Sequence, residues 1–272
     1  MTDRYAVIGN PIHHSKSPLI HREFARQTQQ DMSYEAILSP LDQFVHTVRS
    51  FQNQGGKGLN VTLPFKIEAF RLASQLTERA QSAQAVNTLQ FCNNSEILGD
   101  NTDGAGLVRD IEVNQGVSIR NKNILLMGAG GAARGVILPL LKLSPNRLTI
   151  ANRTLDKAIE LQQQFAGFGN IRSTSYPELI QEKFDIIINA TSASIANELP
   201  PLTPNVFAAQ TLAYDMMYGK QLTPFLQFAQ CSGVNHLVDG IGMLVEQAAE
   251  SFYLWRGIRP ETTTVIRMLK NS

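Results

Sequence analysis

The sequence predicts an α/β protein of two domains, each built on an open sheet of mainly parallel strands. Three observations support this prediction. The chain has 272 residues, of which 43% are hydrophobic and 17% are charged, so it is long and apolar enough to form two cores. Short apolar runs alternate with helical patterns, which is typical of parallel strands joined by helices. A glycine-rich turn joins one buried strand to a helix in the second half, which indicates a doubly wound second domain.

The first series of elements occupies the N-terminal part of the chain. Strands are expected at 4–9, 33–38, 58–63 and 86–91, and helices at 18–30, 41–54 and 64–74. Ser17 followed by Pro18 predicts a capped helix start, because proline at the first helical position loses no hydrogen bond. The polar run 99–104 predicts a break, after which Asn101 to Asp103 can cap a linking helix at about 105–115.

A second series of strands begins at Asn123 and ends in a helix with a long apolar stripe. The expected strands lie at 123–127, 147–151, 185–189, 211–215 and 233–237. Apolar residues then recur at helical spacing, at Ile241, Leu244, Val245, Ala248, Ala249 and Phe252. Because this stripe needs an apolar partner, we expect the chain to return to the first domain after Gly240. Gln247 lies off the stripe, where it can face either a cleft or solvent.

Composition excludes several classes of protein. The formal net charge is only +1, so no global field favours nucleic acid or an anionic membrane. Cys92 and Cys231 have no metal-ligand spacing, and no nearby carboxylate or cysteine completes a set with His13 and His14, so no metal site is expected. The longest apolar stretch, 124–141, is interrupted by glycines, an arginine and a proline. Without a signal peptide or a membrane span, the sequence predicts a cytoplasmic protein with reduced thiols.

The strongest local motif is the run from Asn123 to Arg134, a G-x-G-x-x-A pattern between a strand and a helix. In such a motif Gly128 allows the tight turn, Gly130 lets a pyrophosphate approach bare backbone, and Ala133 lets the helix pack on the strand. The first N–H groups of the helix can then bind phosphate oxygens. The motif predicts a Rossmann-type domain that binds a dinucleotide, and a purely structural turn is the alternative.

The end of the following strand indicates which dinucleotide is bound. Enzymes that use NAD place a carboxylate there for the ribose 2′-hydroxyl, whereas this strand is followed by Asn152, Arg153 and Thr154, with Lys157 nearby. Cations suit a 2′-phosphate, so NADP is favoured. The alternative makes Arg153 a solvated residue and Thr154 a helix cap. Thr191, at the end of the next strand, can contact the ribose or pyrophosphate, or can belong to a plain polar loop.

Four polar clusters in the first half lie where a strand ends or a helix begins, at 15–17, 60–66, 85–88 and 99–104. Each has an ordinary explanation, such as a helix cap, a turn or a solvated lysine. Together they gather hydroxyls, amides, one lysine and one carboxylate at one edge of a sheet. This chemistry suits a small, hydroxylated, anionic substrate.

These motifs strongly resemble the shikimate dehydrogenase family. The matching segments run in order through the whole chain, at 15–18, 60–66, 85–89, 99–104, 128–133, 152–154, 214–216 and 239–244. The resemblance implies reduction of 3-dehydroshikimate to shikimate with NADPH, on the route to the aromatic amino acids. The polar run at 99–104 places the domain boundary near Asp103 and Gly104. Residues 1–103, completed by C-terminal helices in 241–272, are therefore expected to form the substrate-binding and catalytic domain, and 104–240 the NADP-binding domain.

The resemblance also implies a role for particular residues. Lys66 and Asp103 would be the catalytic pair, with Lys66 as acid and base. The substrate carboxylate would be held by Ser15 and Ser17, and Tyr218 would lie against the substrate. The ring hydroxyls would be bound by Asn60, Thr62, Asn87, Asp103 and Gln247. The cofactor would be lined by Glu78, Gly128, Ala129, Gly130, Gly131, Ala132, Asn152, Arg153, Thr154, Lys157, Thr191, Met216 and Gly240.

The sequence departs from the family pattern at two positions. Relatives often have arginine in place of Lys157 and glycine in place of Ser194, which alters one phosphate contact and one loop.

Three alternative functions remain. A relative that also accepts quinate with NAD is one alternative, although the basic Arg153 argues against it. A catalytically silent NADP-binding sensor is another, although it would need neither Lys66 nor Asp103. A structural subunit is the third. The sequence leaves the oligomeric state open, with a homodimer as one option.

Overall fold

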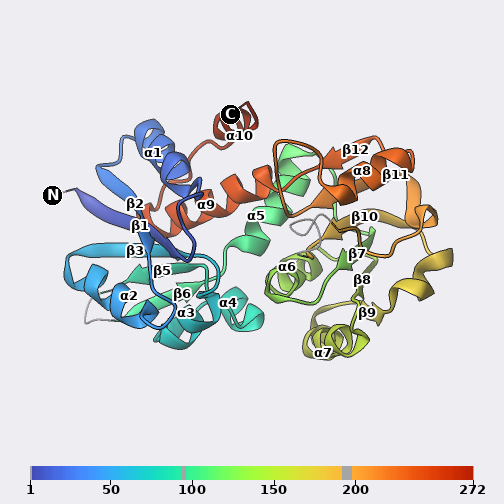
Figure 1. Cartoon of the computed structure of the whole chain (residues 1–272), viewed down its shortest axis with the longest axis horizontal. Helices are drawn as coiled ribbons and strands as arrows, with labels where there is room; N and C mark the ends of the chain where they lie inside the picture. The colour runs from blue at the N-terminus through green and yellow to red at the C-terminus, as the bar shows by residue number, and fades with distance from the viewer. Residues whose placement is uncertain (1, 93–95, 192–197, 272) are drawn as a thin grey trace. The chain divides into compact units, whose positions relative to one another are not determined.

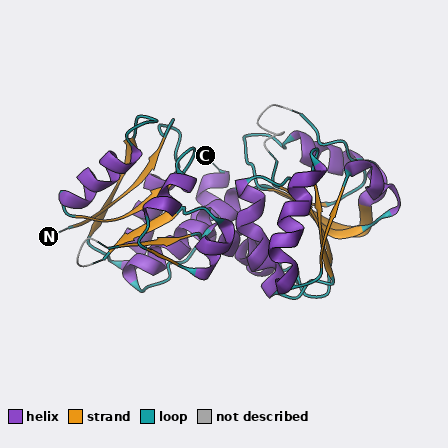
Figure 2. Ribbon diagram, turned by 90° about the horizontal axis from the view of Figure 1, so that it is seen from below, coloured by secondary structure: helices purple, strands orange, loops and turns teal. Residues whose placement is uncertain are grey.

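The computed structural model describes residues 2–92, 96–191 and 198–271 (Figure 1). The chain divides into two compact units: unit 1 comprises residues 1–106 and 244–272, and unit 2 comprises residues 107–243. Each unit contains one six-stranded sheet flanked by helices (Figure 2), so the expected α/β fold class is confirmed. None of the helices in the described ranges combines the length and apolar character that a membrane span requires.

The sheet of unit 1 has the strand order β2-β1-β3-β5-β6-β4. Its strands are β1 (Asp3–Gly9), β2 (Met32–Leu38), β3 (Gly56–Val61), β4 (Gln75–Leu76), β5 (Thr88–Phe91) and β6 (Ile97–Asp100). Its helices are α1 (Ser17–Thr28), α2 (Phe44–Asn53), α3 (Lys66–Leu72), α4 (Glu78–Ala83) and α10 (Thr263–Lys270). Two further helices cross the boundary between the units in sequence, namely α5 (Asp103–Arg109) and α9 (Ile241–Arg256).

Strand β5 runs antiparallel to both of its neighbours, and the other strand pairs in this sheet are parallel. The structure also corrects the predicted break at 99–104. Gly99 and Asp100 form the end of β6, so the break begins only after Asp100. A side chain at Gly99 would lie 2.8 Å from the side chains of Ala73 and Val86, so glycine is required there. Asp100 can be buried in a strand because Arg79 pairs with it.

The N-terminus of α1 also differs from the prediction. Ser17 is the first residue of the helix rather than its cap, and Lys16 occupies the capping position without a side-chain hydrogen bond to the helix. The backbone N–H of Ser17 donates instead to the hydroxyl of Ser15, at 3.3 Å. Ser15 therefore takes over part of the capping role that the sequence pattern assigned to Ser17.

Helix α9 packs on the sheet of unit 1. Its residues Val245, Ala248, Ala249 and Phe252 are almost fully buried, and the ring of Phe252 lies edge-on to Phe24 of α1. The indole of Trp255 donates a hydrogen bond to the carbonyl of Leu89 in β5, at 3.1 Å. Gly58 is needed opposite this indole, because a Cβ there would lie 2.6 Å from its nitrogen.

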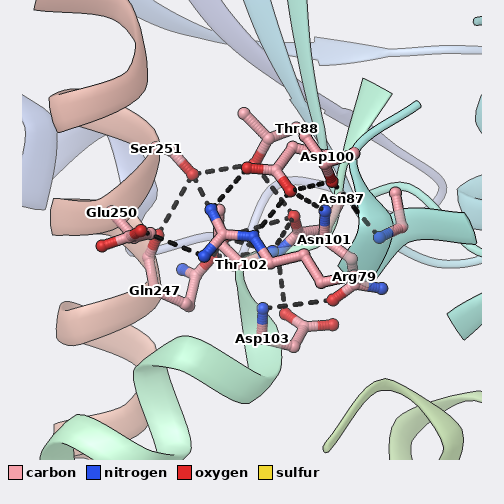
Figure 3. Close-up of polar contacts among 12 residues, drawn as sticks. Arg79, Asn87, Thr88, Asp100, Asn101, Thr102, Asp103, Gln247, Glu250 and Ser251 are labelled. Atoms are coloured by element: carbon pink, nitrogen blue, oxygen red, sulfur yellow. Dashed lines mark hydrogen bonds and ion pairs between the residues drawn. The ribbon is translucent and has the colours of Figure 1, made fainter. Parts of the chain in front are cut away.

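A network of ion pairs connects α4, β6 and α9 within unit 1 (Figure 3). The Arg79 guanidinium donates to both oxygens of Asp100, at 2.7 and 2.5 Å, and to Glu250 of α9 at 3.0 Å. Glu250 in turn accepts a hydrogen bond from Arg259. Burial alone would raise the pKa of Asp100, but the Arg79 guanidinium outweighs it and holds that pKa below its usual value.

The sheet of unit 2 is entirely parallel, with the order β12-β11-β10-β7-β8-β9. Its strands are β7 (Asn123–Met127), β8 (Arg147–Ala151), β9 (Ile171–Thr174), β10 (Phe184–Asn189), β11 (Phe207–Asp215) and β12 (His236–Val238). Its α-helices are α6 (Gly131–Lys142), α7 (Leu155–Phe165) and α8 (Pro224–Cys231). The last strand begins three residues later than predicted, and the strand order is that of a doubly wound domain.

Unit 2 has one apolar core on each face of its sheet. In β7, Ile124 and Leu126 belong to the core that contains α6 and α7, whereas Leu125 and Met127 belong to the core that contains α8. Successive side chains of a strand point to opposite faces, so a strand that is buried on both faces is apolar throughout. This explains why the strands of unit 2 appear as continuous apolar runs in the sequence.

The predicted linking helix at 105–115 is instead two segments. Helix α5 ends at Arg109 and is followed by a π-helical turn, η2 (Asp110–Asn114). Asp110 is fully buried, and its carboxylate accepts hydrogen bonds from Tyr214 at 2.6 Å and from Asn114 at 2.9 Å. A Cβ on Gly242 would lie within 2.1 Å of this carboxylate, so glycine is required at that position.

We predict that Arg79→Leu lowers the free energy of unfolding by about 3–5 kcal/mol at pH 7, because the carboxylate of Asp100 would remain buried without its cation. Urea unfolding measures the change. Arg26→Leu is the control, since its ion pair with Glu23 lies at the surface and should contribute little. A loss no larger than that of the control would contradict the prediction.

The same variant should depend on pH in a defined direction. Because the pKa of Asp100 is lowered in the folded state, its contribution is present above the unfolded carboxyl pKa and disappears as the pH falls through the folded one. The difference in stability between wild type and Arg79→Leu should therefore shrink in acid, as unfolding curves at successive pH values would show.

Candidate functional site

The polar cluster of unit 1 forms where β3, β5 and β6 meet. Asn60 pairs with Thr88 across β3 and β5, and Thr88 pairs with Asp100 across β5 and β6. Because β5 is antiparallel, its first residues lie at the edge where β3 and β6 end. Asn87, just before β5, therefore lies beside Asn60, and its carbonyl accepts a hydrogen bond from Val61 at 2.7 Å.

Lys66 and Asp103 form the charged pair of this cluster. Lys66 is the first residue of α3 and Asp103 the first of α5, and Lys66 Nζ lies 2.5 Å from Asp103 Oδ2. The other carboxylate oxygen, Oδ1, accepts a hydrogen bond from Asn87 Nδ2 at 2.8 Å. The Lys66 side chain is 30% exposed and that of Asp103 is 14% exposed. The ammonium therefore remains accessible, while the Asp103 carboxylate is held by Asn87.

Gln247 faces this cluster rather than solvent (Figure 3). Its Oε1 accepts hydrogen bonds from Asn87 Nδ2 at 3.3 Å and from the hydroxyl of Thr102 at 3.4 Å. The amide of Gln247 also donates to the carbonyl of Leu244 in its own helix, at 2.8 Å. These contacts resolve the two alternatives that the sequence left open for its orientation.

Ser251 is a member of the cluster that the sequence motifs did not indicate. It is fully buried, and its hydroxyl lies 2.8 Å from that of Thr88 and 2.9 Å from Asn60 Nδ2. Ser251 lies four residues after Gln247 in α9, so the two residues share a helix face. That spacing is the signal from which Ser251 could have been found.

The remaining candidates of unit 1 lie in neighbouring loops. Ser15 and Ser17 contact each other at the start of α1, as described above. Thr62 follows β3, and its backbone N–H donates to the carbonyl of Ile8 in β1, at 3.0 Å. A Cβ on Gly9 would lie 2.5 Å from the methyl group of Thr62, so Gly9 provides the space for that side chain.

The glycine-rich turn of unit 2 has the backbone that a dinucleotide requires. Gly128 has a φ of +106°, a conformation that favours glycine, and a Cβ there would lie 3.2 Å from the carbonyl of Ala190. A Cβ on Gly130 or Gly131 would meet nothing within 4 Å, so the backbone before α6 is bare on this side. No side chain in the described ranges caps α6, and Ala133 in the first turn of this helix is fully buried. Ala129 lies in the turn, and Ala132 is the second residue of α6.

The strand ends around this turn are joined to one another. Asn189 Oδ1 accepts hydrogen bonds from the N–H and the hydroxyl of Thr191, and its amide donates to Asp215 at 3.1 Å. The N–H of Met216 donates to the carbonyl of Asn189, at 3.0 Å. A Cβ on Gly240 would lie 2.2 Å from the carbonyl of Met216, so only glycine fits there. Thr191, Met216 and Gly240 therefore belong to one edge of the sheet.

The cationic candidates follow β8. Arg153 and Lys157 are exposed, and the positive charge of Arg153 acts on Tyr176. Burial raises the pKa of Tyr176 to about 12, and Arg153 partly offsets that rise. Thr154 occupies the capping position of α7 without the predicted side-chain hydrogen bond, and its carbonyl accepts one from Asn152 at 2.8 Å.

Two candidates lie in a different unit from the rest of their sets. Tyr218 belongs to unit 2, whereas the other predicted substrate residues belong to unit 1. Glu78 begins α4 in unit 1, whereas the other predicted cofactor residues belong to unit 2. Ser194, one of the two departures from the family pattern, lies outside the described residues.

Three family models match the chain. They are described as "Shikimate dehydrogenase substrate binding domain" over residues 7–89, "Shikimate / quinate 5-dehydrogenase" over residues 111–197, and "Shikimate 5'-dehydrogenase C-terminal domain" over residues 240–269. The matches include Asn60, Lys66, Asn87 and Gln247 of the polar cluster and the glycine-rich turn of unit 2, whereas Asp103 lies between the first two matched ranges. The resemblance inferred from the sequence motifs is confirmed.

Individual relatives agree with these models. A protein of Nitrosospira multiformis named shikimate dehydrogenase (NADP(+)) is 64% identical over all of this chain and 98% of its own length. The crystal structure of an Ael1 enzyme from Pseudomonas putida is 51% identical, has a TM-score of 0.94 and covers 98% of each chain. Shikimate 5-dehydrogenase from Thermus thermophilus, solved with NADP(H) and shikimate, is 28% identical with a TM-score of 0.88 over 99% of each chain. On these grounds the chain belongs to the shikimate dehydrogenase family.

Proposed function

We propose that this chain is an NADP-dependent shikimate dehydrogenase, which reduces 3-dehydroshikimate to shikimate with NADPH on the route to chorismate and the aromatic amino acids. The observation that carries the proposal is the Lys66–Asp103 pair inside a cluster of amides and hydroxyls. It supplies an acid and base beside groups that can bind a hydroxylated ring. The direct test is the absorbance of NADPH when shikimate and NADP⁺ are added together, with quinate and NAD⁺ as parallel assays.

The residues of unit 1 suit a substrate with a carboxylate and several hydroxyls. Ser15 and Ser17 would hold the carboxylate, because hydroxyl and backbone donors are grouped at the start of α1. The ring hydroxyls would be bound by Asn60, Thr62, Asn87, Asp103 and Gln247. A carboxylate oxygen can accept two hydrogen bonds, so Asp103 can bind a substrate hydroxyl while it holds Lys66 and Asn87. Tyr218 of unit 2 is proposed to lie against the substrate.

The residues of unit 2 fit NADP. The bare backbone at Gly130 and Gly131 leaves space for a pyrophosphate at the N-terminus of α6, where N–H groups favour an anion. Arg153 and Lys157 are exposed cations at the end of β8, where the 2′-phosphate of NADP would lie. The cofactor would further contact Thr191, Met216 and Gly240, and Glu78 is proposed to approach it from unit 1. When bound, NADPH supplies the hydride that reduces the ketone.

The protein's part in the chemistry is to move one proton and stabilise one charge. As the ketone is reduced, its oxygen gains negative charge, and the Lys66 ammonium would stabilise that oxygen and donate a proton to it. In the reverse direction the neutral amine would accept the proton from the hydroxyl. Asp103 would hold Lys66 in place and, through Oδ1, would itself be oriented by Asn87.

Two further expectations extend this proposal. The chain is expected to act in the cytoplasm, where its exposed free thiols, Cys92 and Cys231, would remain reduced. A homodimer is proposed as the assembly in solution. Sedimentation of the purified chain would distinguish the mass of a dimer from that of a monomer.

Replacement of Lys66 by alanine should lower kcat by about 10²–10⁴-fold, because it removes the proposed proton donor. Steady-state oxidation of shikimate measures the effect. Lys57→Ala is a matched control, since Lys57 is an exposed lysine of β3 and should leave kcat unchanged. If Lys66→Ala kept more than half of the wild-type kcat, Lys66 would not be the catalytic acid and base.

Replacement of Arg153 by alanine should weaken NADPH binding by about 1.5–3 kcal/mol, the contribution of a charge-assisted hydrogen bond, and should leave NADH binding nearly unchanged. Fluorescence titration with both cofactors measures this difference. The exposed Arg120 of unit 2 provides the control variant Arg120→Ala. Equal losses for NADPH and NADH would show that Arg153 does not contact the 2′-phosphate.

Replacement of Gln247 by alanine should raise the KM for shikimate by about 2- to 13-fold, as expected for one lost hydrogen bond of about 0.5–1.5 kcal/mol. The KM for NADP⁺ should stay largely the same, because Gln247 contacts Asn87 and Thr102 within unit 1. Tyr253→Ala, an exposed change on the same helix, is the control. An unchanged KM for shikimate would contradict the proposed contact.

A further inference from the structure

Tyr34 of β2 reaches the proposed substrate cluster, although no sequence motif includes it. Its hydroxyl donates a hydrogen bond to Asn60 Oδ1, at 2.7 Å. Its ring stacks on the imidazole of His21, with the ring centroids 4.1 Å apart and the planes 5° from parallel. Burial lowers the pKa of His21 to about 3, so this imidazole is neutral near pH 7. The tyrosine ring is therefore held by an uncharged partner, with its hydroxyl directed at Asn60.

The surroundings of Asn60 fix which end of its amide faces Tyr34. On the other side the amide lies 3.3 Å from the carbonyl of Asn87 and 2.9 Å from the hydroxyl of Ser251. A carbonyl can only accept, so the amide nitrogen must face Asn87 and the oxygen must face Tyr34. The oxygen of Asn60 has a second lone pair, which can accept a hydrogen bond from a ligand.

Tyr34 is also close to Ser17, which is proposed to bind the substrate carboxylate. Burial raises the pKa of Tyr34 well above its usual value, and a hydrogen bond with the side chain of Ser17 partly offsets that rise. The Tyr34 side chain therefore lies near a residue proposed for the carboxylate end of the substrate, and its hydroxyl contacts one proposed for the ring hydroxyls.

We propose that Tyr34 is a positioning residue for shikimate, which acts through Asn60 by holding the amide oxygen in place to accept a hydrogen bond from a ring hydroxyl. This inference rests on the proposed function and adds a residue that binds no substrate atom itself. Without the Tyr34 hydroxyl, the amide of Asn60 would lose the donor that holds its oxygen, and the ring hydroxyl would meet a less ordered acceptor.

The test is Tyr34→Phe, which removes the hydroxyl and keeps the ring on His21. We expect the KM for shikimate to rise by about 5- to 100-fold, since the buried Asn60 oxygen loses its donor, while kcat changes less and the KM for NADP⁺ stays constant. Tyr5→Phe is the matched control. It removes another buried tyrosine hydroxyl from the same aromatic cluster, where the Tyr5 ring stacks on Trp255 at 4.7 Å.

A double-mutant cycle separates positioning from a general structural effect. In an Asn60→Ala background, Tyr34→Phe should change the KM for shikimate by less than about twofold, because its target is gone. The full effect in that background, an unchanged KM in the single variant, or an equal rise for both substrates would overturn the inference. If the wild-type chain itself failed to reduce NADP⁺ with shikimate, the proposed function would be wrong and this inference would fall with it.

Discussion

The polar cluster of unit 1 depends on the direction of one strand. Because β5 runs against β3 and β6, the residues before it lie at the edge where those strands end. Asn87 can therefore contact Asp103 in one direction and accept from Val61 in the other. A wholly parallel sheet would place the start of β5 at the opposite edge, and Asp103 would lose the amide that holds its second oxygen. The contacts that Asn87 makes with both Asp103 and Val61 therefore depend on the antiparallel direction of β5.

The sequence predicted strand bounds best where both faces of a strand are buried. Strands β7 and β8 have the predicted bounds because both of their faces are buried, which leaves no polar interruption in either run. The glycine-rich turn was also predictable, since the positive φ of Gly128 allows few other residues, and glycines at 130 and 131 leave the backbone open to a ligand. The family motifs then indicated Lys66, Asp103 and Asn87, which the structure brings into contact.

Other features depend on partners that are distant in sequence. In the sequence, Asp100 looks like a loop residue, because an aspartate is rarely buried in a strand without a partner. Its partner is Arg79, 21 positions earlier, and the sequence pattern does not reveal that pairing. The buried Asp110 accepts a hydrogen bond from Tyr214, which lies 104 positions later in the chain. Tyr34 of β2 contacts Asn60 of β3 although β1 lies between these two strands in the sheet, and nothing in the pattern of β2 distinguishes Tyr34 from an ordinary strand tyrosine. Patterns of hydrophobicity report burial, whereas such pairings are fixed by the tertiary fold.

The two candidate sites differ in how their charges are arranged. In unit 1 the single ammonium is already paired with a carboxylate, and the remaining groups are neutral amides and hydroxyls. In unit 2 the cations that follow β8 are exposed to solvent. Dissolved ions screen exposed charges much more than buried ones, with a screening length of about 8 Å at physiological ionic strength. If the proposed sites are correct, salt would therefore weaken the affinity for the phosphorylated cofactor more than the affinity for the ring substrate.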